Sequence, residues 1–167
     1  MSYPVHFETQ SAHRLELLGR HRQPSDQLLH LRAGSLLMRL GRDEFVLRQG
    51  DLFWLPADCL HGLTLWQGCQ LNRIRFSIRV RGDRPRAAGF LRHHPLLMPL
   101  LERLEQQLAA APLDWQGHSG RLSRLLADLL PEFKVSSHAA EPISQGIQCA
   151  LATVRQGGDL TTIANAC

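Results

Sequence analysis

The sequence lacks the features that would mark a membrane-spanning, secreted or disulfide-linked protein. No apolar run approaches the roughly 20 residues that a membrane helix needs. The N-terminus has neither the charged head nor the apolar middle of a signal peptide. The four cysteines (Cys59, Cys69, Cys149 and Cys167) show no Cys-x-x-Cys spacing and no secreted framework. We therefore expect a soluble, cytoplasmic protein with reduced thiols and no membrane partner.

Lysine is nearly absent, because Lys134 is the only lysine among 19 basic residues. The other basic residues are arginines, and seven of them fall within residues 73–92. Arginine clusters can neutralise the phosphates of nucleic acid. A solvated strand edge followed by a linker accounts for this cluster more simply, and we interpret it in that way.

Catalytic motifs are also missing. No glycine-rich loop is suited to hold phosphates, and no serine or cysteine has a matching base and orienting group nearby in the sequence. The apolar fraction of 44% is ample for a hydrophobic core. At 167 residues the chain fits one domain, or one domain and part of a second. We expect neither an enzyme nor a bound cofactor, and no catalytic residue is assigned.

The first half of the chain has the pattern of short antiparallel strands. Glycine-containing turns separate apolar runs that recur at intervals of about ten residues or less, which is typical of a sandwich or closed barrel. Gly50-Asp51 forms one such turn before the wholly apolar run Leu52 to Leu55. After a break at Pro56, His61 opens the next segment. The strand that begins near residue 70 alternates Ile74 and Phe76 on one face with arginines on the other.

The second half of the chain has helical periodicity. Leucines at helical spacing fall in two segments, residues 100–108 and 119–133, which predicts a helical hairpin. A third helix is predicted over about residues 142–155, and Gly157-Gly158 ends it. Asp159 is a suitable N-cap for a fourth helix, which the chain end at Cys167 leaves about two turns long.

In order and spacing, these segments resemble the N-terminal part of an AraC-type bacterial transcription regulator. Residues 50–56 with His61 look like the second cupin motif, and residues 27–34 look like the end of the first. Residues 159–164 look like the opening of the first helix-turn-helix. The resemblance implies an α+β chain: a cupin-like β-barrel over residues 1–82, a helical hairpin over 83–137, and the start of a truncated DNA-binding domain over 138–167.

The resemblance also implies functions for these parts. The barrel would bind a small-molecule effector, the hairpin would form a homodimer, and the intact protein would bind DNA through helices beyond Cys167. The residues we expect to line the effector site are His21, Gln23, Gln27, Trp54, His61 and Trp66. The residues we expect in the dimer interface are Leu100, Leu104, Leu108, Leu122, Leu125, Leu126 and Leu129.

Two alternatives to effector sensing stay open. Metal-binding cupins hold an ion with three histidines and a carboxylate, and the matching positions here are His21, Gln23, Gln27 and His61. Two amides stand where an anionic ligand and a histidine belong, so we expect no metal and keep a metal-dependent cupin enzyme as the alternative. The other alternative is a redox sensor that uses Cys59 or Cys69 near His61.

Overall fold

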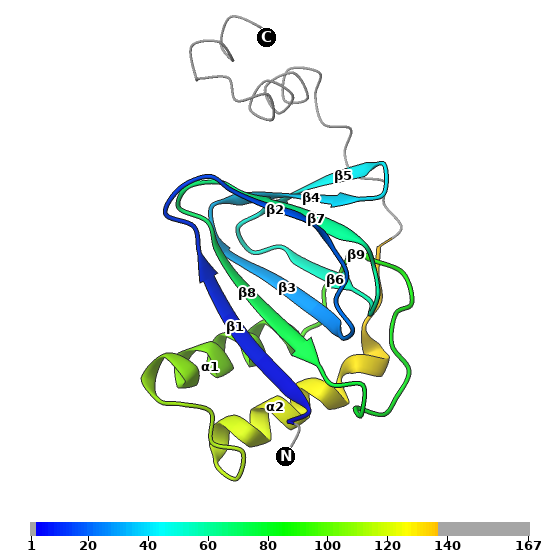
Figure 1. Cartoon of the computed structure of the whole chain (residues 1–167). Helices are drawn as coiled ribbons and strands as arrows, with labels where there is room; N and C mark the ends of the chain where they lie inside the picture. The colour runs from blue at the N-terminus through cyan, green and yellow to red at the C-terminus, as the bar shows by residue number, and fades with distance from the viewer. Residues whose placement is uncertain (1–2, 137–167) are drawn as a thin grey trace, which may run out of the picture.

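Two antiparallel sheets face each other and form the body of the protein (Figure 1). A computed structural model of the chain describes residues 3–136. The five-stranded sheet has the order β1 (Val5–Ser11), β8 (Gln70–Phe76), β3 (Asp26–Ala33), β6 (Leu52–Leu55) and β9 (Gly89–Phe90). The four-stranded sheet has the order β2 (Glu16–His21), β7 (His61–Leu65), β4 (Ser35–Leu40) and β5 (Asp43–Arg48).

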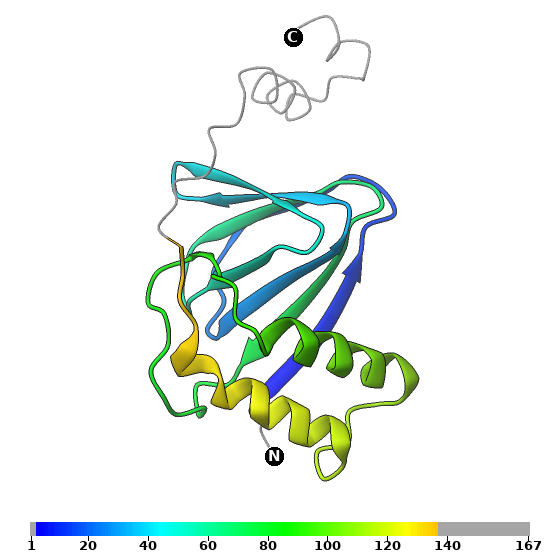
Figure 2. The same ribbon diagram turned by 180° about the vertical axis from the view of Figure 1, so that it is seen from behind.

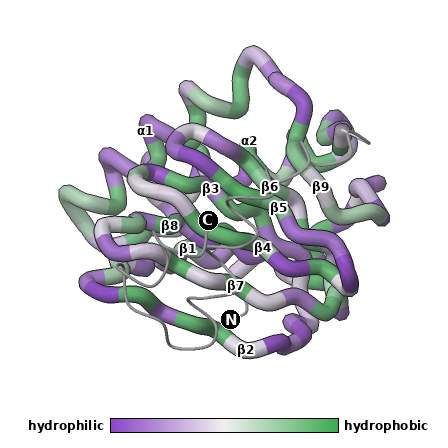
Figure 3. The backbone as a smooth tube through the Cα atoms, turned by 90° about the horizontal axis from the view of Figure 1, so that it is seen from above, coloured by the Kyte–Doolittle hydropathy of each residue, from purple (hydrophilic) through white to green (hydrophobic). Residues whose placement is uncertain are grey.

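The space between the two sheets is the inner core. Leu29 of β3, Phe53 of β6 and Leu71 of β8 point into it from the five-stranded sheet, and Met38 and Leu63 point into it from the four-stranded sheet. Side chains alternate between the two faces of a strand, so hydrophobic and hydrophilic residues follow one another along the chain (Figure 3). In the central strands β3 and β6 most residues are buried whichever face they point to.

A helical hairpin covers the outer face of the five-stranded sheet. It consists of α1 (Leu97–Ala110) and α2 (His118–Asp128), followed by the short 3-10 helix η1 (Leu130–Glu132). Figures 1 and 2 show both helices on the same side of β1, β8 and β3. Leucines of both helices pack there on Leu28, Trp54 and Ile74, which form a second, outer core.

These elements confirm the predicted fold class, an α+β chain with an antiparallel β unit followed by a helical hairpin. The predicted third and fourth helices and the start of a DNA-binding domain, residues 138–167, lie outside the described residues. Within residues 3–136, no helix is long and apolar enough to cross a membrane.

Gly50 and Gly34 adopt backbone conformations that other residues rarely reach. Gly50 has a φ of 91° in the turn before β6, and Gly34 has a φ of 76° between β3 and β4. A Cβ atom on Gly34 would lie 2.9 Å from the Cα of Cys69, whereas one on Gly50 would meet nothing within 4 Å. Glycine is therefore required at position 50 by the backbone angle alone. At position 34 it is required both by the backbone angle and by the backbone of Cys69 that passes beside it.

Candidate functional site

His61 is a buried histidine with one unused ring nitrogen. It is the first residue of β7 and is 1% exposed. Its Nδ1 donates a hydrogen bond to the backbone carbonyl of Cys59 over 3.0 Å, because a carbonyl oxygen can only accept. In the neutral ring this leaves a lone pair on Nε2, and Nε2 has no partner among the described residues. Burial, together with the charges of His21 and Arg73, lowers the pKa of His61, which favours that neutral form.

His21 lies directly beside His61. The two residues are opposite each other in the β2–β7 ladder, and their ring centroids are 4.4 Å apart with 55° between the ring planes. β2 continues to His21 after an irregularity in register that follows Leu18. The shift in register makes His21 the cross-strand partner of His61, which brings two of the expected effector residues together.

Arg73 lies on the barrel-facing side of β8, which corrects our interpretation of the arginine cluster. Along β8 it follows Leu71 by two residues, and it is opposite Leu29 of β3; both leucines belong to the inner core. Arg73 is 8% exposed and donates a hydrogen bond to Oε1 of Gln10 over 2.6 Å. Its Nε has no partner among the described residues. Burial lowers the pKa of Arg73, since the charged form loses hydration.

Other polar groups lie near Arg73 on β1, β2 and β3. Arg75 forms an ion pair with Glu8 at 3.0 Å, and Gln10 donates a hydrogen bond to Glu16 over 2.8 Å. Gln27 is buried opposite Arg75 and Leu55, on the barrel-facing side of β3. The burial of Arg73 was not predictable from the sequence, since a strand with alternating arginines is normally solvated on that face.

The remaining expected effector residues lie elsewhere. Trp54 is opposite Leu28, so it faces the outer core, where its indole N–H donates to the carbonyl of Pro85 over 2.9 Å. Trp66 lies just beyond β7 and is half-buried. Gln23 is half-buried in the connection after β2, where its carbonyl accepts a hydrogen bond from the amide of Asp58.

The expected dimer-interface leucines lie mostly beneath the hairpin. Leu125 alone among them is exposed, at 45%. Leu108 and Leu122 pack partly buried against the outer core. The four that are fully buried there are Leu100, Leu104, Leu126 and Leu129.

The histidine pair does not complete a metal site. Within residues 3–136 no group of three or more histidine, cysteine, aspartate or glutamate side chains is arranged to hold an ion. Gln23 and Gln27 supply amides where the cupin pattern has a histidine and a carboxylate, and amides bring no negative charge. The residues present therefore do not fit a cupin metal ion.

Both described cysteines are free thiols in surroundings that disfavour the thiolate. Cys69 is fully buried and Cys59 is partly buried. Burial raises the pKa of each thiol. Reactive cysteines need the opposite, a lowered pKa with access to solvent.

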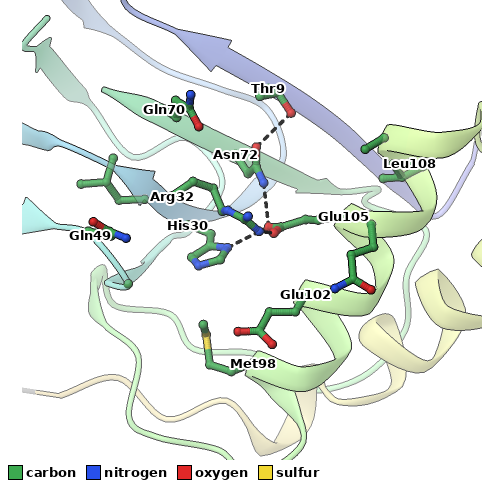
Figure 4. A pocket seen from close by; sticks show the side chains of 14 residues that line it. Thr9, His30, Arg32, Gln49, Gln70, Asn72, Met98, Glu102, Glu105 and Leu108 are labelled. Atoms are coloured by element: carbon green, nitrogen blue, oxygen red, sulfur yellow. Dashed lines mark hydrogen bonds and ion pairs between the residues drawn. The ribbon is translucent and has the colours of Figure 1, made fainter. Parts of the chain in front are cut away.

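A polar network joins the outer face of the five-stranded sheet to α1 (Figure 4). Oε1 of Glu105 accepts hydrogen bonds from His30 Nδ1 over 2.8 Å and from Asn72 Nδ2 over 2.6 Å, and Oε2 pairs with Arg32. Asn72 in turn accepts a hydrogen bond from Thr9. Sequence reasoning missed this network, because Glu105 and His30 are 75 residues apart along the chain.

The network borders an open groove of about 650 Å³ between the sheet and α1. Burial and the charge of Arg32 lower the pKa of His30 to about 4, against an opposing effect of Glu102. His30 is therefore neutral at pH 7. Its Nδ1 carries the proton, since the carboxylate of Glu105 can only accept.

Comparison with solved structures finds similar chains of low sequence identity. A cupin superfamily protein from Desulfitobacterium hafniense is 17% identical over 46% of this chain and 70% of its own, with a TM-score of 0.43. A conserved protein of unknown function from Streptococcus pyogenes is 17% identical over 46% and 68%, with a TM-score of 0.42. An oxalate decarboxylase variant from Bacillus subtilis is 13% identical over 46% and 22%, with a TM-score of 0.39.

No curated protein matches the chain. Its sequence does match one family of domains, and the match runs from the first residues of β1 through the hairpin to Phe133. That span contains His21, His61, Arg73 and Glu105. Through residues 4–133, the chain belongs to the AraC-like ligand binding domain family.

Proposed function

We propose that the chain is the effector-sensing part of a cytoplasmic, AraC-type transcription regulator. Among residues 3–136, the buried polar atoms without a partner that carry this proposal are Nε2 of His61 and Nε of Arg73. Nε of Arg75 is a third such atom on the same face of β8, but its guanidinium is already paired with Glu8. A buried polar atom that lacks a hydrogen bond costs about 1–3 kcal/mol. A small molecule that bound beside His61 and Arg73 would satisfy their two atoms, and this gives the barrel a reason to retain them.

The polar groups lie at the margin of an apolar interior, which is the usual composition of a small-molecule site. Leu18 and Leu63 of the four-stranded sheet contribute to the inner core near the histidine pair. His21, Gln27 and His61 remain in the proposed site, and Arg73 joins them. The proposal assigns binding to this site and no catalytic step.

The network around Glu105 offers a route from the barrel to the helices. Asn72 and Arg73 are consecutive in β8, so a ligand on Arg73 that shifts this strand also moves the hydrogen bond between Asn72 and Glu105. The free energy available to move α1 equals the difference in the ligand's binding free energy between the shifted and the unshifted positions of the strand. In the intact regulator α1 and α2 would pass that difference to a dimer partner and to DNA-binding helices that begin within residues 138–167.

A thermal-shift screen of the chain against small metabolites tests the proposal. A ligand that binds only the folded protein raises the unfolding midpoint as its concentration rises. The shift should be lost in His61→Ala and kept in His13→Ala, since His13 is exposed in the connection between β1 and β2. A hit that both variants retain equally would place binding outside the barrel and contradict the proposal.

The alternative reading as a metal-dependent cupin enzyme predicts a stoichiometric transition metal in the purified protein. The two amides in the cupin ligand positions argue against it, as described above. Metal analysis that found one ion for each chain would favour the enzyme.

A further inference from the structure

Arg73 is a buried cation without a carboxylate partner. No ion pair within residues 3–136 includes it. Among the described residues, its one hydrogen-bond acceptor is the neutral amide oxygen of Gln10. A buried charge is costly unless it is paired, and an arginine that neither pairs nor reaches solvent is rarely retained for stability.

The nearby carboxylates do not fill this role. Glu8 is opposite Arg73 in the β1–β8 ladder and its charge raises the pKa of Arg73, but it forms its ion pair with Arg75 and 48% of its side chain is accessible. Glu16 accepts a hydrogen bond from Gln10 rather than from Arg73. Arg75 is paired with Glu8, and Glu16 reaches Arg73 only through Gln10. Of the two arginines, Arg73 is therefore the cation left without a direct carboxylate contact among the described residues. One guanidinium balances a single carboxylate, and its planar fork matches a carboxylate in geometry.

His61 imposes a second chemical requirement. Its Nδ1–H is already used by the carbonyl of Cys59, so its neutral ring offers an acceptor, and not a donor, at Nε2. A ligand group that meets Nε2 must therefore donate a hydrogen. A hydroxyl group does so without placing a second positive charge near Arg73.

We propose that the effector is a small hydroxy acid, whose carboxylate binds Arg73 and whose hydroxyl donates a hydrogen bond to Nε2 of His61. The assignment rests on the proposed function, because it names the ligand class of the same barrel site. The apolar side chains of Leu18 and Leu63 accept the carbon skeleton.

Matched probe molecules test the carboxylate contact and the hydroxyl contact separately. The complete 167-residue chain is titrated with mandelate, with phenylacetate (which lacks the hydroxyl) and with mandelamide (which lacks the charge). An aliphatic series of 2-hydroxyhexanoate, hexanoate and 2-hydroxyhexanamide runs beside it, so that a ring too wide for the barrel does not decide the result. Inorganic phosphate is titrated as well, to test whether the site prefers a phosphate to a carboxylate. Calorimetry gives the affinity, and thermal unfolding gives the shift.

The hydroxy acid should bind tightest within at least one series. Loss of the hydroxyl should weaken binding about 10-fold, and loss of the charge about 10-fold to 100-fold, as expected for one hydrogen bond and one charge-assisted contact. Arg73→Met should abolish the preference for the acid, and Arg73→Lys should restore part of it. Arg79→Met, at an exposed position beyond β8, should bind like the wild type.

The ligand-free variants provide a readout that does not depend on the probe. If Arg73 is kept for a ligand, Arg73→Met should unfold at a temperature equal to or above that of the wild type. A clear loss of stability would assign Arg73 to a structural role with Gln10 and overturn the inference.

The other possible binding results each test one part of the inference. Amides that bind as well as acids would overturn the anionic class and leave ligand sensing in place. Acids without the hydroxyl that bind equally well would overturn the role of His61. Phosphate that binds more tightly than every acid, or no shift with any acid, would overturn the hydroxy-acid assignment, and the wider screen would then judge the proposed function by itself.

Discussion

Asn72 and Arg73 are consecutive in β8 and face opposite sides of the five-stranded sheet. Arg73 reaches toward Gln10 on the barrel side, and Asn72 donates a hydrogen bond to Glu105 of α1 over 2.6 Å. One strand therefore touches both the proposed effector site and the helix that covers the sheet. The contacts of Asn72 and Arg73 therefore connect the two faces of the sheet through neighbouring residues.

Replacing Glu105 with Gln should destabilise the fold by about 2–4 kcal/mol, because a carboxylate with 11% of its side chain exposed loses its charge while three donors keep their positions. Glu132→Gln is the matched control. Glu132 also pairs with a histidine, His94, but its side chain is 60% exposed, so the change should cost less than about 1 kcal/mol. Chemical denaturation measures both. Equal losses in the two variants would show that the network around Glu105 adds nothing.

The stability of the protein should fall as the pH falls from about 6.5 toward 4. His30 has a folded-state pKa of about 4, below the 6.5 of a free histidine, so between these values the unfolded chain binds more protons. The contribution is complete above pH 6.5, decreases through the window and levels off below pH 4. Its size is at most about 3 kcal/mol, and the lowered pKa of His61 acts in the same direction.

Denaturation at a series of pH values, with His30→Asn beside the wild type, isolates this contribution. The groups that face His30 are Glu105, Arg32 and Glu102. The variant removes the titrating ring, so its stability should depend less steeply on pH within the window. His13→Asn is the control at an exposed position. Identical slopes for His30→Asn and the wild type would contradict the assignment.

The two turn glycines should respond differently to alanine. Gly50→Ala should cost about 1 kcal/mol, the penalty for a side chain at a positive φ. Gly34→Ala carries the same penalty, and its new Cβ would lie 2.9 Å from the backbone of Cys69, so we expect a loss of at least about 2 kcal/mol. Urea denaturation compares them. A larger loss for Gly50→Ala would contradict the close approach at Gly34.

The strands were predictable from sequence because the turn chemistry is local. Gly50-Asp51 indicated the start of the strand Leu52–Leu55, and the structure has β6 at those residues. The alternation of Ile74 and Phe76 with arginines also predicted the two faces of β8. Which face is solvated was not predictable, because it depends on the sheet opposite. The hairpin covers Ile74, and the barrel encloses Arg73.

The candidate site was predicted only in part for a similar reason. His21 and His61 were expected in the site and meet in the structure. Trp54 was expected in the site as well, but strand register directs it to the outer core with Leu28. A shift of one residue in register would reverse that direction, and register is set by partners far along the chain.

The homodimer stays a prediction, and Leu125 is the residue on which it can be tested. Most leucines of the hairpin are buried on their own sheet, so a dimer must use the face that the structure leaves exposed. Light scattering at tens of micromolar should return a dimer for the wild type and a monomer for Leu125→Glu. Leu17→Glu, at a residue of β2 that is 59% exposed, should remain dimeric. A monomeric wild type would contradict the prediction.

Electron density inside the barrel of a crystal grown without added ligand tests the central claim most directly. A copurified effector should appear beside His61, within hydrogen-bond distance of its Nε2 and of the guanidinium of Arg73. The account predicts density that water cannot explain, with the shape of a small acid. A barrel in which protein side chains satisfy both groups and leave no room for a ligand would contradict it.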